Sequence, residues 1–221
     1  MIKKYLNELK QFDRETLLII VFSTFILLFT VYFRGNRFIF PNQRFLNRLI
    51  VSGLIFGLSP FVLLLVFRHK PKDFGISLGN VKLWSKEVLF FYLIMVAILL
   101  VAFKFTNLKH TYPLYRNAAK GMNYFFMYQG IQLFHMLTWE FFFRGFMLFS
   151  LEKKVGPRLS ILIQTIPFAI MHFRKPQLEA YGSIFAGIFL GIIAYRGRSF
   201  LPCFFLHFAV ALTADIIGII L

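Results

Sequence analysis

Apolar residues dominate seven stretches of the chain, and short polar segments that carry most of the charges separate them. A helix needs about 20 apolar residues to cross a bilayer, and several of the stretches approach this length. The pattern therefore predicts an all-α polytopic transmembrane helical bundle of about seven spans. The stretches are residues 17–33, 49–67, 88–103, 122–149, 160–173, 178–195 and 200–221.

Two of these stretches depart from the usual length of a span. Residues 122–149 are too many for one straight span, so we expect this helix to tilt or to extend past the membrane. Residues 160–173 are few, and Pro167 lies among them, where it can bend a helix. Both stretches are therefore expected to be irregular spans.

The sequence divides into three parts of one membrane domain. Residues 1–16 form the N-terminal segment, and within it residues 2–12 carry apolar side chains at helical spacing with lysines between them. This pattern predicts a short amphipathic helix in the membrane interface, with a frayed tail as the alternative. Residues 17–121 are expected to form the N-terminal transmembrane helices and connectors, and residues 122–221 a core that carries the polar motifs.

Composition agrees with a membrane protein, because 58% of the residues are hydrophobic and only 15% are charged. The net charge of +16 comes from short basic clusters between apolar runs, as expected for residues that face lipid headgroups. We therefore predict the lipid bilayer as a partner and no nucleic acid. The loops on the side of the N-terminus carry fourteen Lys and Arg residues against ten opposite, which indicates a cytoplasmic N-terminus.

Of nine acidic residues, only Glu140 and Asp215 lie well inside apolar stretches. An ionisable group at membrane depth is costly and is a candidate functional residue. Arg144 follows Glu140 by one helical turn, so the two side chains can neutralise each other. This pair either only balances charge or also takes part in chemistry.

Histidines provide the second half of a possible site. His172 ends the fifth apolar stretch, and His207 lies in the last one, so Glu140 and two imidazoles come from three different helices. If these helices pack together, a carboxylate and two imidazoles can serve general acid–base catalysis. Two His and one Glu are also a known zinc set, but no H-E-x-x-H spacing is present. We predict no cofactor, with zinc as the alternative.

Two further polar residues have less defined roles. His135 precedes Glu140 by five residues, about 140° around the helix, so we expect it to point elsewhere. Asp215 lies two turns after His207 on nearly the same face. It either joins the cavity or reaches the interface near the C-terminus, and we expect the second. A proton relay that uses Glu140 and Asp215 would make the protein a small transporter.

Small and aromatic residues suggest packing contacts. Gly182, Gly187 and Gly191 are expected to allow close contact between helices. The run Phe141–Phe143 is expected to face lipid or to pack. Glycines in the 72–79 loop predict tight bends at the interface.

At these polar residues the chain resembles the CPBP family, the CAAX proteases and bacteriocin-processing enzymes, also called the Abi family. Members carry E-E-x-x-x-R, F-x-x-x-H and H-x-x-x-N on three membrane helices. Glu140 and Arg144 resemble the second Glu and the Arg of the first motif. Phe168 and His172 match the second motif, and His207 matches the His of the third.

The resemblance covers about residues 122–215, and the order and spacing of the motifs fit. Gly145 stands where the family usually has a Gly after the Arg, and the 195–202 stretch resembles the family's short basic turn. Two positions depart from the pattern: the first Glu is Trp139, and the Asn of the third motif is Ala211. In the family's proposed mechanism that Glu, with the His of the second motif, activates water.

The resemblance implies a membrane-embedded endopeptidase that acts on a membrane-associated peptide or protein, in a bacterial or archaeal cell membrane. In that case Glu140 and His172 would activate water, His207 would polarise the scissile carbonyl, and Arg144 would orient Glu140. Trp139, Phe168 and Ala211 would line the substrate cavity, with Asp215 as a further candidate. Because the indole of Trp139 cannot act as a general base, the alternative is a catalytically inactive relative. Such a protein would bind a membrane partner as an immunity or scaffold protein.

Overall fold

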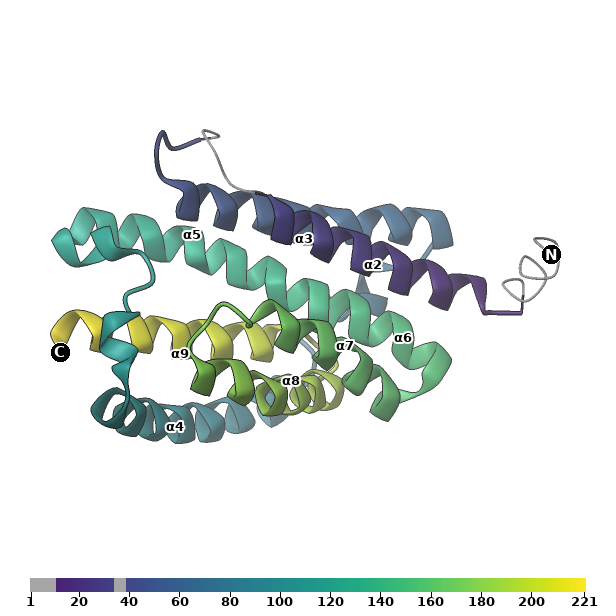
Figure 1. The fold of residues 1–221 in the computed structure, drawn as a ribbon. Helices are drawn as coiled ribbons and strands as arrows, with labels where there is room; N and C mark the ends of the chain where they lie inside the picture. The colour runs from purple at the N-terminus through teal and green to yellow at the C-terminus, as the bar shows by residue number, and fades with distance from the viewer. Residues whose placement is uncertain (1–10, 34–38) are drawn as a thin grey trace.

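The computed structural model describes residues 11–33 and 39–221, and all regular elements within these ranges are helices (Figure 1). The predicted all-α class is confirmed. Most of the predicted amphipathic N-terminal segment, residues 1–10, lies outside the described residues. The helix that follows begins at Arg14, three residues before the expected start of the first span, and Asp13 caps it by accepting a hydrogen bond from the Thr16 amide.

Each of the seven apolar stretches forms helix. The helices are α2 (Arg14–Tyr32), α3 (Arg44–Phe67), α4 (Val81–Phe105), α5 (Met122–Glu140), α6 (Leu148–Val155), α7 (Pro157–Met171), α8 (Gln177–Gly197) and α9 (Leu201–Ile220). Five of these, α2, α3, α4, α8 and α9, are long and apolar enough to cross a membrane, and α7 is a shorter apolar helix. The chain is an integral membrane protein.

The long fourth stretch is one rod in three parts. Helix α5 runs into η4, a π-helical segment of residues Phe141–Met147, and α6 continues to Val155. Residues 122–155 span about 50 Å at 1.5 Å per residue, which exceeds a hydrocarbon layer of about 30 Å. The rod must therefore tilt or extend past the membrane.

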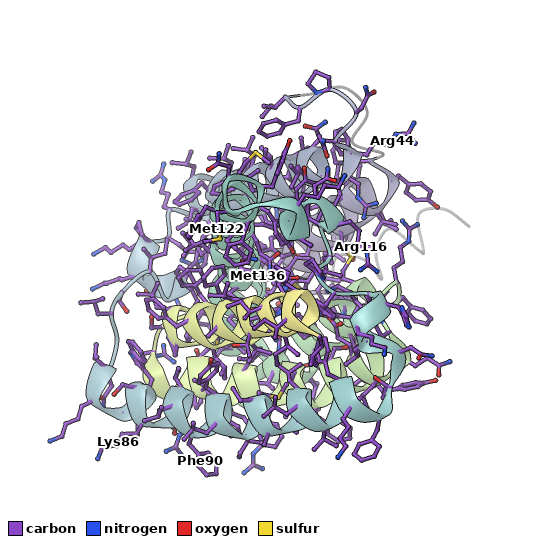
Figure 2. The ribbon with its side chains drawn as sticks, turned by 90° about the vertical axis from the view of Figure 1, so that its left-hand side faces the viewer. Arg44, Lys86, Phe90, Arg116, Met122 and Met136 are labelled. Atoms are coloured by element: carbon purple, nitrogen blue, oxygen red, sulfur yellow. The ribbon has the colours of Figure 1, made fainter. Side chains whose placement is uncertain are left out.

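This rod forms the centre of the bundle (Figure 1). Helices α2 and α3 lie along one side of it, whereas α4, α7, α8 and α9 lie on the other. Helix α3 packs on α5, α9 packs on α5 and α4, and α7 packs on α6 and α8. In Figure 2, which views the molecule from the end at which Met122 begins α5, Lys86 and Phe90 project outward from α4. The Phe90 side chain is 59% exposed, as expected for a helix that faces lipid.

Close contact between α7 and α8 depends on two glycines. A Cβ atom on Gly187 would lie 2.7 Å from the Thr165 side chain, and one on Gly191 would lie 2.9 Å from Ile161. The predicted packing role is confirmed for both. It is wrong for Gly182, where a Cβ atom would meet nothing within 4 Å.

The connector between α3 and α4 is fixed to the turn between α8 and α9. Gly75 and Gly79 both have positive φ angles, and a Cβ atom on Gly79 would overlap the Gly197 carbonyl. The Asn80 amide donates to that carbonyl at 2.9 Å. The predicted bends are therefore present, and they hold these two connectors at the same end of the bundle.

Candidate active site

Glu140 and Arg144 lie at the junction of α5 and η4, in the middle of the central rod. Both side chains are fully buried. An Arg144 terminal nitrogen lies 3.3 Å from one Glu140 carboxylate oxygen and 3.2 Å from the other. A buried carboxylate needs such a partner, because burial of a lone charge is very costly. The predicted one-turn pair is formed where α5 meets a π-helical segment, which is a kind of segment often found at functional sites.

His207 brings α9 into the same contact. Its Nδ1 lies 2.6 Å from the Glu140 Oε1 atom. Because an ionised carboxylate only accepts hydrogen bonds, Nδ1 carries the proton. In the neutral ring the other nitrogen, Nε2, is then a hydrogen-bond acceptor. A carboxylate behind an imidazole fixes its tautomer and orientation, as in other catalytic dyads and triads. The His207 side chain is 18% exposed, in contrast to the buried carboxylate.

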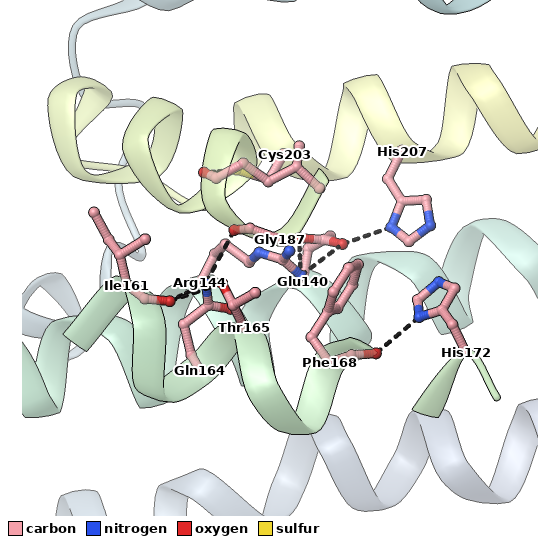
Figure 3. A network of polar contacts seen from close by, with 11 residues as sticks. Glu140, Arg144, Ile161, Gln164, Thr165, Phe168, His172, Gly187, Cys203 and His207 are labelled. Atoms are coloured by element: carbon pink, nitrogen blue, oxygen red, sulfur yellow. Dashed lines mark hydrogen bonds and ion pairs between the residues drawn. The ribbon is translucent and has the colours of Figure 1, made fainter. Parts of the chain in front are cut away.

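His172 stands at the C-terminal end of α7, beside His207. Its Nδ1 donates to the Phe168 carbonyl at 2.8 Å, and a carbonyl can only accept, so Nε2 of the neutral ring is again an acceptor. The two imidazoles are stacked, with 6.2 Å between ring centroids and 25° between planes. In Figure 3 their unbonded nitrogens lie on the side of the rings away from Arg144. The structure thus places two imidazole rings next to each other, each held through its Nδ1 atom.

Phe168 connects the charged pair to the second histidine. The Arg144 guanidinium lies 3.8 Å from the centre of the Phe168 ring, and the His172 ring lies 4.6 Å from it. A cation held over an aromatic face gains electrostatic attraction, which is larger when both groups are desolvated. Phe168 therefore holds Arg144 on one side and His172 on the other.

Trp139 occupies the position of the missing acid. Its ring packs at 5.0 Å from Phe143 and at 6.0 Å from His172, between α3 and α7. The indole nitrogen is buried and has no hydrogen-bond partner among the described residues. An indole can only donate, so His172 has no acidic partner on this side. Ala211, one turn beyond His207, is half-buried and offers no side-chain polar group.

Asp215 forms a second buried polar centre rather than a surface group. It is fully buried, and it does not join the Glu140 cluster. It accepts hydrogen bonds from the Leu114 amide at 3.1 Å, from Gln129 at 3.1 Å and from Gln132 at 3.5 Å. These partners belong to α5 and to the connector before it, not to the Glu140 cluster. The sequence contained a signal for this centre, since Gln129 and Gln132 lie three residues apart in an apolar helix.

His135 points away from Glu140, as its position around the helix predicted. Its Nδ1 lies 3.2 Å from the Ser52 hydroxyl of α3, and its ring lies 5.5 Å from that of Trp139. Among the residues in the described ranges, no group of three or more His, Cys, Asp or Glu side chains is arranged to hold a metal ion.

Fold and site together define a class: a helical integral membrane protein with a carboxylate, a guanidinium and two imidazoles gathered inside the bundle. The family model of the Rce1-like type II CAAX prenyl endopeptidases, which are part of the CPBP family, matches residues 121–213. The matched segment contains Glu140, His172 and His207. The resemblance inferred from the three motifs is thus confirmed for this part of the chain. The chain matches no curated protein and no solved structure at a significant level.

Proposed function

We propose that this protein is an intramembrane endopeptidase that hydrolyses a peptide bond of a membrane-associated peptide or protein. One observation carries the proposal: the His207 and His172 rings are neighbours, each is held through its Nδ1, and a buried carboxylate orients the first of them. In the neutral form of each ring this leaves Nε2 as an acceptor. A water molecule between two such acceptors can be oriented and deprotonated.

The chemistry needs one water molecule and the transfer of both of its protons. His207 Nε2 takes a proton from water as the oxygen forms a bond to the scissile carbonyl carbon. Glu140 balances the positive charge that develops on the His207 ring. The protonated His207 ring then gives this proton to the leaving nitrogen as the C–N bond breaks. The second proton of the water also passes to the amine, so a carboxylate and an ammonium group depart. The second acceptor, His172, orients the water during attack.

These roles differ from those implied by the family pattern. There, Glu140 with His172 would activate water, but in this chain both Glu140 oxygens face Arg144 and His207. The structure therefore favours Glu140 as the group that orients His207, with Arg144 neutralising the carboxylate. His172 keeps a free Nε2 without an acid behind it.

The substrate follows from the location of the site. We propose as substrate a peptide held in the bilayer, including one that carries a prenyl group or a leader segment, because the site lies inside a membrane bundle and the His207 side chain is partly exposed. We propose a bacterial or archaeal cell membrane as the location, a cytoplasmic N-terminus from the excess of basic residues on that side, and hydrolysis without a bound metal.

A cleavage assay with matched histidine variants tests this function. The purified protein in liposomes is offered a library of membrane peptides with and without prenyl groups. We expect the His172→Ala and His207→Ala variants each to lose about 10²–10⁴-fold in rate, the usual contribution of a general acid or base. His135→Ala, which removes a buried imidazole that faces α3, is expected to retain activity. Equal activity in all three variants would exclude the proposal.

A second function has its own support. Trp139 replaces the family's first Glu, and the Glu140 carboxylate is fully buried between its two partners. Both features suit a catalytically inactive relative that binds a membrane peptide or partner. In that case the wild-type protein would retain peptides from the library without cleaving any of them.

A further inference from the structure

Three arginines gather at one end of the bundle, outside the Glu140 cluster. Arg44 and Arg48 lie one turn apart at the start of α3, and Arg174 follows the end of α7. They line a hollow of about 400 Å³ together with the last residues of α2. Figure 2 views the molecule from this end, with Arg44 at its outer edge. The full lining is Val31, Tyr32, Phe33, Arg44, Arg48 and Arg174.

Within residues 11–33 and 39–221, no carboxylate balances the positive charge of this arginine hollow. Among the described residues no carboxylate forms an ion pair with Arg44, Arg48 or Arg174. The adjoining 34–38 segment contains no acidic residue in the sequence. The acid nearest to Arg174 in the chain, Glu179, already pairs with Lys175 at 2.9 Å and accepts from Tyr112.

Like charges in this hollow repel each other. Arg48 lies on α3 and Arg174 on the turn after α7, and their two charges interact unfavourably. An anion between them would remove this repulsion. The planar guanidinium group forms paired hydrogen bonds to phosphate oxygens, so a phosphate group is the anion that these side chains suit best.

An apolar surface continues from the hollow along α2. Four exposed apolar or aromatic residues recur at helical spacing on one face of this helix. They are Val21 (56% exposed), Phe25 (65%), Leu28 (52%) and Tyr32 (79%). In a membrane this stripe faces acyl chains, and its last residue lines the hollow. The charged hollow and the apolar stripe are thus arranged like the two parts of a phospholipid. The headgroup would lie in the hollow and the acyl chains along α2.

We propose that the arginine hollow binds the phosphate headgroup of an anionic membrane lipid, with its acyl chains along the exposed stripe of α2. Arg174 lies two residues after His172, so the bound headgroup would also tie the end of α7 to the start of α3. This inference does not depend on peptide hydrolysis, because lipid retention is measured without a substrate.

The test compares lipid retention among charge variants. The protein is exchanged into vesicles of phosphatidylglycerol mixed with phosphatidylcholine, and the lipids that remain after purification are measured by native mass spectrometry. Each basic residue near a charged surface contributes about 1 kcal/mol, or about fivefold in affinity. We expect Arg48→Gln with Arg174→Gln to reduce the preference for phosphatidylglycerol about 25-fold, and Arg44→Gln alone about fivefold.

The control is Lys120→Gln, which removes one exposed charge at the same end of the bundle. It should leave the preference unchanged. All three arginines are exposed, so their replacement creates no cavity in the core. Each variant should therefore unfold at the wild-type temperature in uncharged detergent. An equal loss in the Lys120 variant would reduce the effect to general surface charge and overturn the proposal.

Two further outcomes would overturn it. Displacement of phosphatidylglycerol by millimolar inorganic phosphate would show a free-anion site rather than a lipid site. Unchanged lipid retention, together with weaker cleavage only of peptides that end in a free carboxylate, would assign the arginines to a peptide substrate instead.

Discussion

At the scale of single residues, the account depends on a charged pair that has no contact with water. Glu140 and Arg144 are both 0% exposed, and Phe168 and His207 complete their surroundings. Such a pair adds little net stability, but the loss of one partner leaves an uncompensated buried charge. The pair therefore constrains which substitutions the core can tolerate.

We predict that Arg144→Leu lowers the free energy of unfolding by about 3–5 kcal/mol, because it leaves the Glu140 carboxylate buried without its cationic partner, with only the His207 hydrogen bond remaining. Thermal unfolding in detergent measures this loss. Arg158→Leu is the matched control, since Arg158 is exposed near the start of α7, and we expect a change within about 0.5 kcal/mol. Equal losses in the two variants would contradict the role of the pair.

A second prediction at this scale concerns metal. No group of three or more metal-binding side chains is assembled in the described part of the chain, and we propose hydrolysis without a metal. Cleavage by the purified protein should therefore be unchanged after dialysis against a chelator, and added zinc should not raise it. A loss of activity that only zinc restores would require a metal mechanism.

At the scale of elements, the helices could be predicted from the sequence, but the π-helical segment could not. Apolar runs gave all seven helical stretches because burial in lipid or protein requires apolar side chains over the length of a span. Within Phe141–Met147 every residue is buried, so no alternation of polar and apolar positions indicates how the helix is rotated. The rotation of this helix about its axis determines which side chains contact Glu140. The sequence alone does not define that rotation.

Only some of the glycines in α8 form the helix contacts that their sequence pattern predicts. Gly182, Gly187 and Gly191 look alike in the sequence, but only the last two touch α7, because a side chain on Gly182 would point into open space. The motif order likewise predicted that Glu140 and His207 come together. It could not predict that His172 donates a hydrogen bond to the Phe168 carbonyl, because every residue has a backbone carbonyl and the sequence does not indicate which one is used.

We predict opposite effects for two glycine substitutions in α8. Gly187→Ala places a methyl group 2.7 Å from Thr165 and should destabilise the protein by about 1–3 kcal/mol. Gly182→Ala meets no neighbour and should be neutral or stabilising by up to about 1 kcal/mol, because Ala favours helix over Gly. Unfolding of both variants in the same detergent gives the comparison. Destabilisation of equal size would mean that α7 and α8 pack differently.

At the scale of the whole molecule, one thiol reports on the integrity of the bundle. Cys203 is the single cysteine of the chain, is fully buried, and donates to the Leu190 carbonyl between α9 and α8. The packing of α8 and α9 must open before a reagent reaches it. The same packing keeps α9, and therefore His207, against the central rod.

We expect a thiol-reactive dye to leave Cys203 unlabelled in the folded protein and to label it in one transition on heating. The midpoint of labelling should coincide with loss of helical signal in circular dichroism. Rapid labelling at room temperature would show that α9 is not packed as described, and the histidine pair would lose its support.

The most direct test of the central claim is a double-mutant cycle of Glu140 and His207 on kcat/KM for a cleaved membrane peptide. If the carboxylate acts by orienting His207, Glu140→Gln should cost activity while His207 is present and almost none once His207 is replaced by Ala. The two losses would then be strongly non-additive. Independent losses that multiply in the double variant would contradict the account, because Glu140 would then act on the reaction without His207.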